Sequence, residues 1–313
     1  MNKNPFILVL ALLGIILAQP SGLSALPVVK YHTAKVDNLN LFYREAGDPS
    51  RPTVVLLHGF PSSSHMYRNL IPLLAEKYHV IAPDYPGFGQ SDQPSVDAFA
   101  YTFDHLAEVT DHLLDSLKIA RYSIYIQDYG SPVGFRLFTK HPERITAIIS
   151  QNGNAYSEGL SPFWAENLEP YWKDRNATTE AKVRGLLTAA TTRFQYSAGY
   201  RDAKHISPDA WTHDQSILDR PGNAEIQLAL FYDYRNNLKQ YEKWHAALRK
   251  AQPPVLAVWG KNDPIFAPAG ALAFKRDVPD AEIHLLDTGH FALEEDGAVI
   301  ADHILGFLQR KVQ

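Results

Sequence analysis

The chain of 313 residues contains no cysteine. This absence excludes thiol catalysis, disulfide bonds and metal sites with cysteine ligands. None of the 13 histidines falls into a spacing such as H-E-x-x-H, so we expect neither a metal nor another cofactor. Internal repeats and low-complexity tracts are also missing. The formal net charge is only −4 and no basic block occurs, which argues against nucleic acid or an anionic membrane as a partner.

The composition is that of an ordinary globular enzyme. Hydrophobic residues make up 45% of the chain and charged residues 20%, which is enough for a sizeable core. At this length one large domain, or one domain with an inserted subdomain, fits better than two independent folds. Nothing in the composition points to a particular oligomeric state.

Residues 1–25 have the pattern of a secretory signal peptide. Lys3 precedes an unbroken apolar run at residues 6–18, and Pro20 follows this run closely. The run is too short to span a bilayer comfortably, and small residues then lead to Ala25. We therefore expect cleavage near Ala25 and an exported protein, periplasmic or secreted, without a membrane segment in its mature form. An uncleaved membrane anchor is the alternative.

Beyond residue 25, strand-like and helix-like segments alternate, which is typical of a layered α/β fold. Strands are expected at residues 39–45, 52–57, 79–84, 122–127, 145–151, 253–259 and 282–286. Helical periodicity covers residues 66–77, 103–117 and 296–309. From about residue 152 to 250 the strand rhythm disappears and a helical pattern replaces it. The expected organisation is a core at 26–152 and 251–313, with a helical cap at 153–250 inserted over an active site.

The segment at residues 125–131 carries the most informative feature. A short apolar strand ends just before Asp128, and a helical run begins near Gly130. Such a strand-to-helix bend can hold one side chain at a strained apex, as in the nucleophile elbow, which usually carries serine in G-x-S-x-G. Here the apex residue is Asp128, and Ser131 lies three residues too late to replace it. A carboxylate at the apex favours attack on carbon over the acyl transfer of an esterase or lipase.

Three further motifs follow predicted strands. The sequence His-Gly-Phe-Pro at 58–61 ends the second strand, and its glycine allows a close turn. The amide of Phe60 could then point at a developing oxyanion, with the amide of Tyr129 as its partner. Asp263 follows the strand at 253–259, and His290 follows the last strand. The chain order of nucleophile, acid and histidine is the one expected for an α/β-hydrolase.

Together these motifs resemble the epoxide hydrolase and haloalkane dehalogenase branch of the α/β-hydrolases. The matching segments are residues 58–61, 84–92, 127–130, 262–263 and 289–291, in the family's order. The resemblance implies an α/β-hydrolase fold, with a mostly parallel twisted sheet flanked by helices and a helical cap inserted after the half that carries the nucleophile. No cofactor is implied.

The resemblance also implies a mechanism. Asp128 attacks an electrophilic carbon and forms an alkyl-enzyme ester. His290, oriented by Asp263, activates the water that hydrolyses this ester. The amides of Phe60 and Tyr129 hold the oxyanion.

The leaving group separates the two activities of this branch. Epoxide hydrolases use cap tyrosines, whose phenols donate to the opening ring at neutral pH. Residues 230–237 resemble the family's second cap-tyrosine segment, which assigns this role to Tyr234. Tyr171 is the candidate for the first cap tyrosine, with Tyr156 and Tyr196 as rivals.

Haloalkane dehalogenases instead hold the departing halide with indole N–H groups and often an asparagine amide. The corresponding positions are Tyr129 and Phe60, which argues against halide release, although Tyr129 is unusual for either group. Trp172 could serve a halide as a cap tryptophan does in fluoroacetate dehalogenases, but no arginine beside Asp128 would bind the substrate carboxylate.

The sequence therefore predicts that water is added to a small or mid-sized hydrophobic epoxide, giving a vicinal diol. The alternatives are a haloalkane or haloacid dehalogenase, or a general α/β-hydrolase of another substrate. A non-catalytic binding protein is the least favoured, since all three members of the triad are present.

Overall fold

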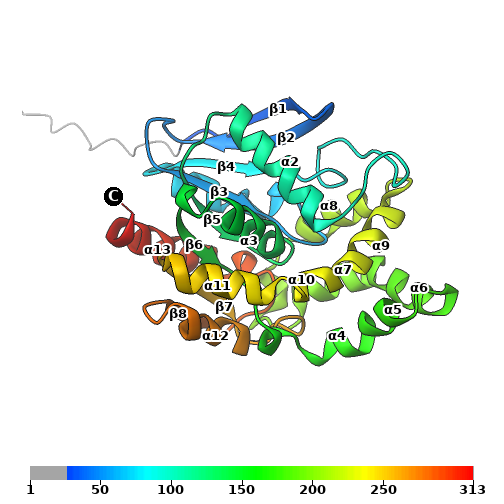
Figure 1. Ribbon diagram of the computed structural model, residues 1–313. Coiled ribbons are helices and arrows are strands. Elements are labelled where there is room, and N and C mark those ends of the chain that lie inside the picture. The colour runs from blue at the N-terminus through cyan, green and yellow to red at the C-terminus, as the bar shows by residue number, and fades with distance from the viewer. Residues whose placement is uncertain (1–26, 313) are drawn as a thin grey trace, which may run out of the picture.

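A computed structural model describes residues 27–312, and the predicted signal peptide at residues 1–25 lies outside them. The centre of the described part is one sheet of eight strands (Figure 1). In chain order these are β1 (Lys30–Val36), β2 (Leu39–Ala46), β3 (Thr53–Leu57), β4 (His79–Pro83), β5 (Tyr122–Ile126), β6 (Ile145–Ser150), β7 (Val255–Gly260) and β8 (Glu282–Leu286). Within residues 27–312, no helix combines the length and the apolar character that a membrane crossing requires.

The spatial order of the sheet is β1-β2-β4-β3-β5-β6-β7-β8. From β4 through β3 to β8 all neighbours pair in parallel, whereas β1 and β2 pair antiparallel with each other and β2 pairs antiparallel with β4. Asp37 and Asn38 form the tight connection between β1 and β2, both at positive φ, which these residue types tolerate better than most. The mostly parallel sheet of the predicted fold is confirmed.

Helices cover both faces of this sheet (Figure 1). One face packs against α2 (Phe103–Ser116), α3 (Gly130–Lys140), α11 (Tyr241–Ala251) and α12 (Ala269–Asp277). The other face packs against α1 (Leu70–Ala75) and α13 (Leu293–Lys311). Strand β3 has apolar side chains on both faces of the sheet. Val55 and Leu57 belong to the hydrophobic core under α2, α3, α11 and α12, and Val54 and Leu56 belong to the core under α1 and α13.

The helix predicted at residues 66–77 is not continuous. The structure has a 3-10 turn, η1 (Ser64–Tyr67), followed by the separate helix α1. Pro72 explains the break, because it has no N–H to donate to the carbonyl of Arg68 and its ring would clash with that carbonyl. In α1, Pro72 instead occupies the first turn, where a missing N–H costs nothing. The elements β1 and α12 have no counterpart among the predicted segments.

The predicted cap segment, 153–250, is helical apart from its connections (Figure 1). Its helices are α4 (Pro162–Asn167), α5 (Glu169–Lys173), α6 (Ala177–Arg184), α7 (Ala189–Ser197), α8 (Pro208–Leu218), α9 (Asn223–Asp233), α10 (Arg235–Leu238) and α11. Of these, α11 packs against α3 and α12 beside the sheet, with Trp244 stacked on Phe135. By its packing, α11 thus lies in the layer of helices that covers the sheet, although the predicted cap segment includes it.

Candidate active site

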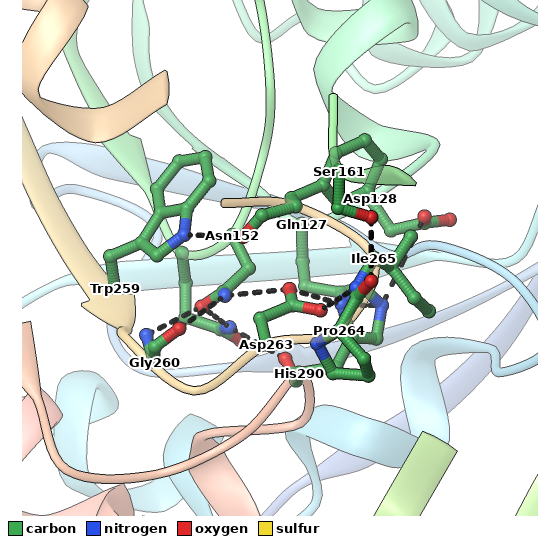
Figure 2. A network of polar contacts seen from close by, with 12 residues as sticks. Gln127, Asp128, Asn152, Ser161, Trp259, Gly260, Asp263, Pro264, Ile265 and His290 are labelled. Atoms are coloured by element: carbon green, nitrogen blue, oxygen red, sulfur yellow. Dashed lines mark hydrogen bonds and ion pairs between the residues drawn. The ribbon is translucent and has the colours of Figure 1, made fainter. Parts of the chain in front are cut away.

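Asp128 occupies the apex of the bend between β5 and α3 (Figure 2). Its φ is 47°, in the left-handed region that residues with a Cβ seldom adopt. Two glycines make room for the bend: a Cβ on Gly59 would lie 2.3 Å from the Cβ of Asp128, and one on Gly130 would lie 2.0 Å from the carbonyl oxygen of Leu57. A strained backbone that presents one buried carboxylate at a strand end is typical of a functional position.

The carboxylate of Asp128 faces two main-chain amides. The amide of Phe60 donates to Oδ1 at 2.7 Å, and the amide of Tyr129 contacts the same carboxylate. Burial raises the pKa of Asp128 to about 6, against the lowering effects of His290 and of the two amides. The group is therefore mostly ionised at neutral pH but poorly solvated, which suits a carboxylate nucleophile.

His290 and Asp263 reach this carboxylate from the loops after β8 and β7. Nδ1 of His290 lies 2.7 Å from Oδ2 of Asp263, and both side chains are fully buried. Nε2 of His290 lies 3.9 Å from Oδ2 of Asp128. Burial acts to lower the pKa of His290, but the carboxylates of Asp263 and Asp128 outweigh it and raise this pKa. An imidazole held between two carboxylates can accept a proton at Nε2 and stabilise the resulting charge.

Asn152 fixes the position of Asp263, as Figure 2 shows. Its Nδ2 donates to Oδ2 of Asp263 at 2.8 Å, and its Oδ1 accepts from the amide of Gly260 at 2.9 Å. The amide of Ile265 donates to Oδ1 of Asp263 at 2.7 Å. All the oxygens of this buried acid thus have donors, as a buried charge requires. Asn152 is absent from the predicted site, although its place directly after β6, at the same sheet edge, is a signal that could have found it.

Gln127 is a second residue absent from the predicted site. Its Nε2 lies 2.9 Å from Nε2 of His290 (Figure 2). Because Asp263 accepts the Nδ1 proton, Nε2 of His290 is the acceptor and Gln127 the donor. Oε1 of Gln127 is buried and has no hydrogen-bond partner among the described residues. Only its position next to Asp128 marks Gln127 in the sequence.

A pocket lies between Asp128 and the cap. Its lining residues are Phe60, Asp128, Tyr129, Phe163, Trp164, Leu168, Leu186, Thr191, Phe194, Gln195, Phe231, Tyr234 and Ile265. Most of these side chains are apolar, which suits a hydrophobic substrate with few polar groups. Throughout residues 27–312, no cluster of three or more His, Cys, Asp or Glu side chains is placed to hold a metal ion.

A family model described as the alpha/beta hydrolase fold matches residues 52–297. The chain belongs to this family. The match covers most of the chain and both halves of the site, from the Phe60 loop to the His290 loop.

Three similar proteins narrow the placement of this α/β-hydrolase. An uncharacterized hydrolase of Saccharomyces cerevisiae is 46% identical over 283 residues, covering 89% of this chain and 97% of the relative. A haloalkane dehalogenase of Mycobacterium marinum is 28% identical over 283 residues, covering 86% of this chain and 89% of the relative. The solved structure of the epoxide hydrolase CorEH without ligand has a TM-score of 0.73 at 20% identity, covering 90% and 99% of the two chains. The predicted branch of epoxide hydrolases and haloalkane dehalogenases is thus confirmed, and the chain is a hydrolase.

Of the predicted cap tyrosines, the structure brings only Tyr234 into the pocket of this α/β-hydrolase. Tyr234 lies between α9 and α10, with its ring centroid 6.1 Å from that of Tyr129 and 4.4 Å from that of Trp164. Burial raises the pKa of Tyr234 well above its ordinary value, so its phenol stays protonated and able to donate.

Tyr171 and its two rivals lie outside the pocket lining. Tyr171 is fully buried and packs against Tyr232, with ring centroids 5.5 Å apart. Tyr156 stacks on His245, and Tyr196 stacks on Phe291. The structure therefore brings Asp128, His290, Asp263, Phe60, Tyr129 and Tyr234 together and leaves Tyr171 apart.

The two tryptophans nearest the cap tyrosine both use their indole N–H groups elsewhere. Trp164 lines the pocket, and its Nε1 donates to the carbonyl of Ile265 at 2.9 Å. Nε1 of Trp172 donates to the carbonyl of Phe231 at 2.7 Å. Neither N–H is free to hold a halide in this arrangement.

Proposed function

We propose that this α/β-hydrolase adds water to epoxides through a covalent ester on Asp128. One observation carries the proposal: a single apolar pocket holds the buried carboxylate of Asp128 and the protonated phenol of Tyr234. A nucleophile that faces the pocket from the core and a proton donor that faces it from the cap are what ring opening of an epoxide needs.

In the first step, the carboxylate of Asp128 attacks one carbon of the epoxide ring. Its Oδ2 is the attacking atom, since the amide of Phe60 already binds Oδ1. As the new C–O bond forms, the ring C–O bond breaks and its electron pair moves to the epoxide oxygen. Tyr234 transfers its proton to that oxygen, which leaves a hydroxyl group on the substrate and a phenolate on the enzyme.

In the second step, water hydrolyses the ester. Nε2 of His290 takes a proton from the water as its oxygen adds to Cγ of Asp128, and Asp263 stabilises the imidazolium that forms. The amides of Phe60 and Tyr129 bind the oxyanion. Collapse releases the diol oxygen, which takes the proton from His290, while the new carboxyl group returns a proton to Tyr234.

Halide release is the rival reaction within this branch. It needs N–H donors where the halide departs, and Trp164 and Trp172 are both bonded to main-chain carbonyls. The positions beside the nucleophile hold Phe60 and Tyr129, whose side chains offer no N–H group. These contacts support the epoxide over the halide.

The test is intact-mass spectrometry of the variant His290→Gln after incubation with epoxides and, separately, with alkyl halides. Without the base, the ester on Asp128 should accumulate and add the mass of the epoxide. His284→Gln is the matched control, because His284 lies on β8 and stacks on His303 away from the pocket, so this variant should turn over and hold no adduct. An adduct from a halide but from no epoxide, or an adduct on a residue other than Asp128, would overturn the proposal.

A second variant tests the donor. Replacing Tyr234 with Phe keeps the ring but removes the phenol, and we expect formation of the ester to slow by about a hundredfold. Tyr171→Phe is the matched control and should leave the rate of ester formation unchanged, because Tyr171 does not line the pocket. Rapid-quench measurement of ester formation checks both variants, and equal rates in Tyr234→Phe and the wild type would remove Tyr234 from the mechanism.

A further inference from the structure

Gln195 lies in the pocket lining, and its side chain has no hydrogen-bond partner within residues 27–312. It lies on α7 in the cap, and only 4% of its surface is exposed. Across the described residues its side chain forms no hydrogen bond, whereas the neighbouring Thr191 uses its hydroxyl to donate to the carbonyl of Gly185 at 2.9 Å. Gln195 also has no part in the proposed reaction. Its amide is therefore an uncommitted polar group of the lining, as is the buried hydroxyl of Tyr129.

The surroundings of this amide are apolar. On the cap side of the pocket it shares the lining with Phe163, Leu168 and Leu186, and Asp128 and Phe60 line the opposite, core side. The amide atoms are not sealed from solvent: they reach the open space of the pocket, where water can solvate them. A ligand oxygen that enters the pocket can replace this water as the hydrogen-bond partner of the amide.

We infer that Gln195 recognises a neutral oxygen on the substrate, a hydroxyl or a carbonyl, that an apolar stretch separates from the epoxide ring. This inference rests on the proposed function and names its substrate class. An amide can donate to a carbonyl, and it can both donate to and accept from a hydroxyl. The pocket lining includes no Arg, Lys or His, so nothing in it would neutralise a carboxylate at that end of the substrate.

The test compares matched epoxides. The terminal epoxides of hexene, octene and decene are each assayed beside counterparts that carry a hydroxyl group or a carboxylate on the far carbon. For the wild type we expect kcat/KM to be highest for a hydroxyl-ended member and to exceed that of its plain counterpart by about tenfold, the size of one buried neutral hydrogen bond. Gln195→Leu should lose this preference. Thr191→Val, which removes a hydroxyl already used within the protein, should keep it.

An unchanged preference in Gln195→Leu would overturn the inference, and so would a wild-type preference for the carboxylate series. The plain epoxides distinguish a failure of the inference about Gln195 from a failure of the proposed function. If His290→Gln forms an ester with them and the wild type shows no hydroxyl preference, only the role of Gln195 is wrong. If no epoxide of any series forms an ester on Asp128, the proposed function itself is wrong.

Discussion

Replacing Asp263 with Asn separates the two steps of the proposed reaction. Asp263 contacts His290 but not the attacking carboxylate, so ester formation should proceed while ester hydrolysis loses the charge that supports the imidazolium. With Nδ1 and Oδ2 at 2.7 Å, the two charges are centred about 4 Å apart, and at an effective dielectric constant of about 20 they interact by about 4 kcal/mol. Since about 1.4 kcal/mol changes a rate tenfold, hydrolysis should slow by about a thousandfold.

The assay is rapid-quench mass spectrometry of a single turnover with an epoxide, which reports the rise and decay of the ester. In Asp263→Asn the ester should rise at nearly the wild-type rate and then persist. Asp287→Asn is the control, because Asp287 lies on the same loop as His290 but pairs with Lys261 at the surface, where such pairs contribute little. If ester formation and hydrolysis slowed equally in Asp263→Asn, the separation of roles would be refuted.

Three predictions concern pH. Because the pKa of Asp128 is raised to about 6, the rate of ester formation should fall as the pH drops through that value, by about tenfold per pH unit below it. A rate measured by rapid quench that stays constant down to pH 4 would contradict this. Gln127 donates to Nε2 of His290 and so favours the neutral imidazole. Gln127→Leu should therefore raise the pKa of His290. The acidic limb of the pH profile for ester hydrolysis should then move to higher pH, whereas the acidic limb for ester formation should stay in place. Asp214, buried under Tyr196, has its pKa raised by burial from 3.8 to about 7, so the folded state holds a proton that the unfolded chain releases between these values. The free energy of unfolding should therefore fall as the pH rises from about 4 to about 7, and Asp214→Asn should flatten this slope; identical slopes in denaturant titrations of the two proteins would count against the assignment.

The central sheet is predictable because its strands are buried on both faces. Strand β5 is apolar or aromatic at most positions and bounded by turn residues, and the pattern alone indicates it. Strand β1 lies at an exposed edge, where four of its seven residues are exposed and the apolar pattern is weak, so it escapes prediction. Helix α1 is shorter than its periodicity suggests, because Pro72 prevents the helix from extending toward its N-terminus and joining η1.

The residues of the candidate site also differ in whether the sequence predicts their position. Asp128, Asp263 and His290 each follow a strand, and the carboxyl ends of neighbouring parallel strands meet at one edge of the sheet, so their proximity can be predicted from chain order. The cap offers no such rule. Tyr171 is one of many aromatic residues there, and whether its ring faces the pocket or the cap interior depends on tertiary packing, which local periodicity does not encode.

The most direct test of the covalent mechanism is a single turnover in water labelled with oxygen-18. If Asp128 is the nucleophile, the first diol formed takes its new oxygen from the carboxylate, and the label appears in the peptide that contains Asp128. We therefore predict an unlabelled diol and a labelled Asp128 peptide from one turnover of excess enzyme with an epoxide. A labelled diol with an unlabelled peptide would mean that water attacks the ring directly, and it would contradict the covalent ester.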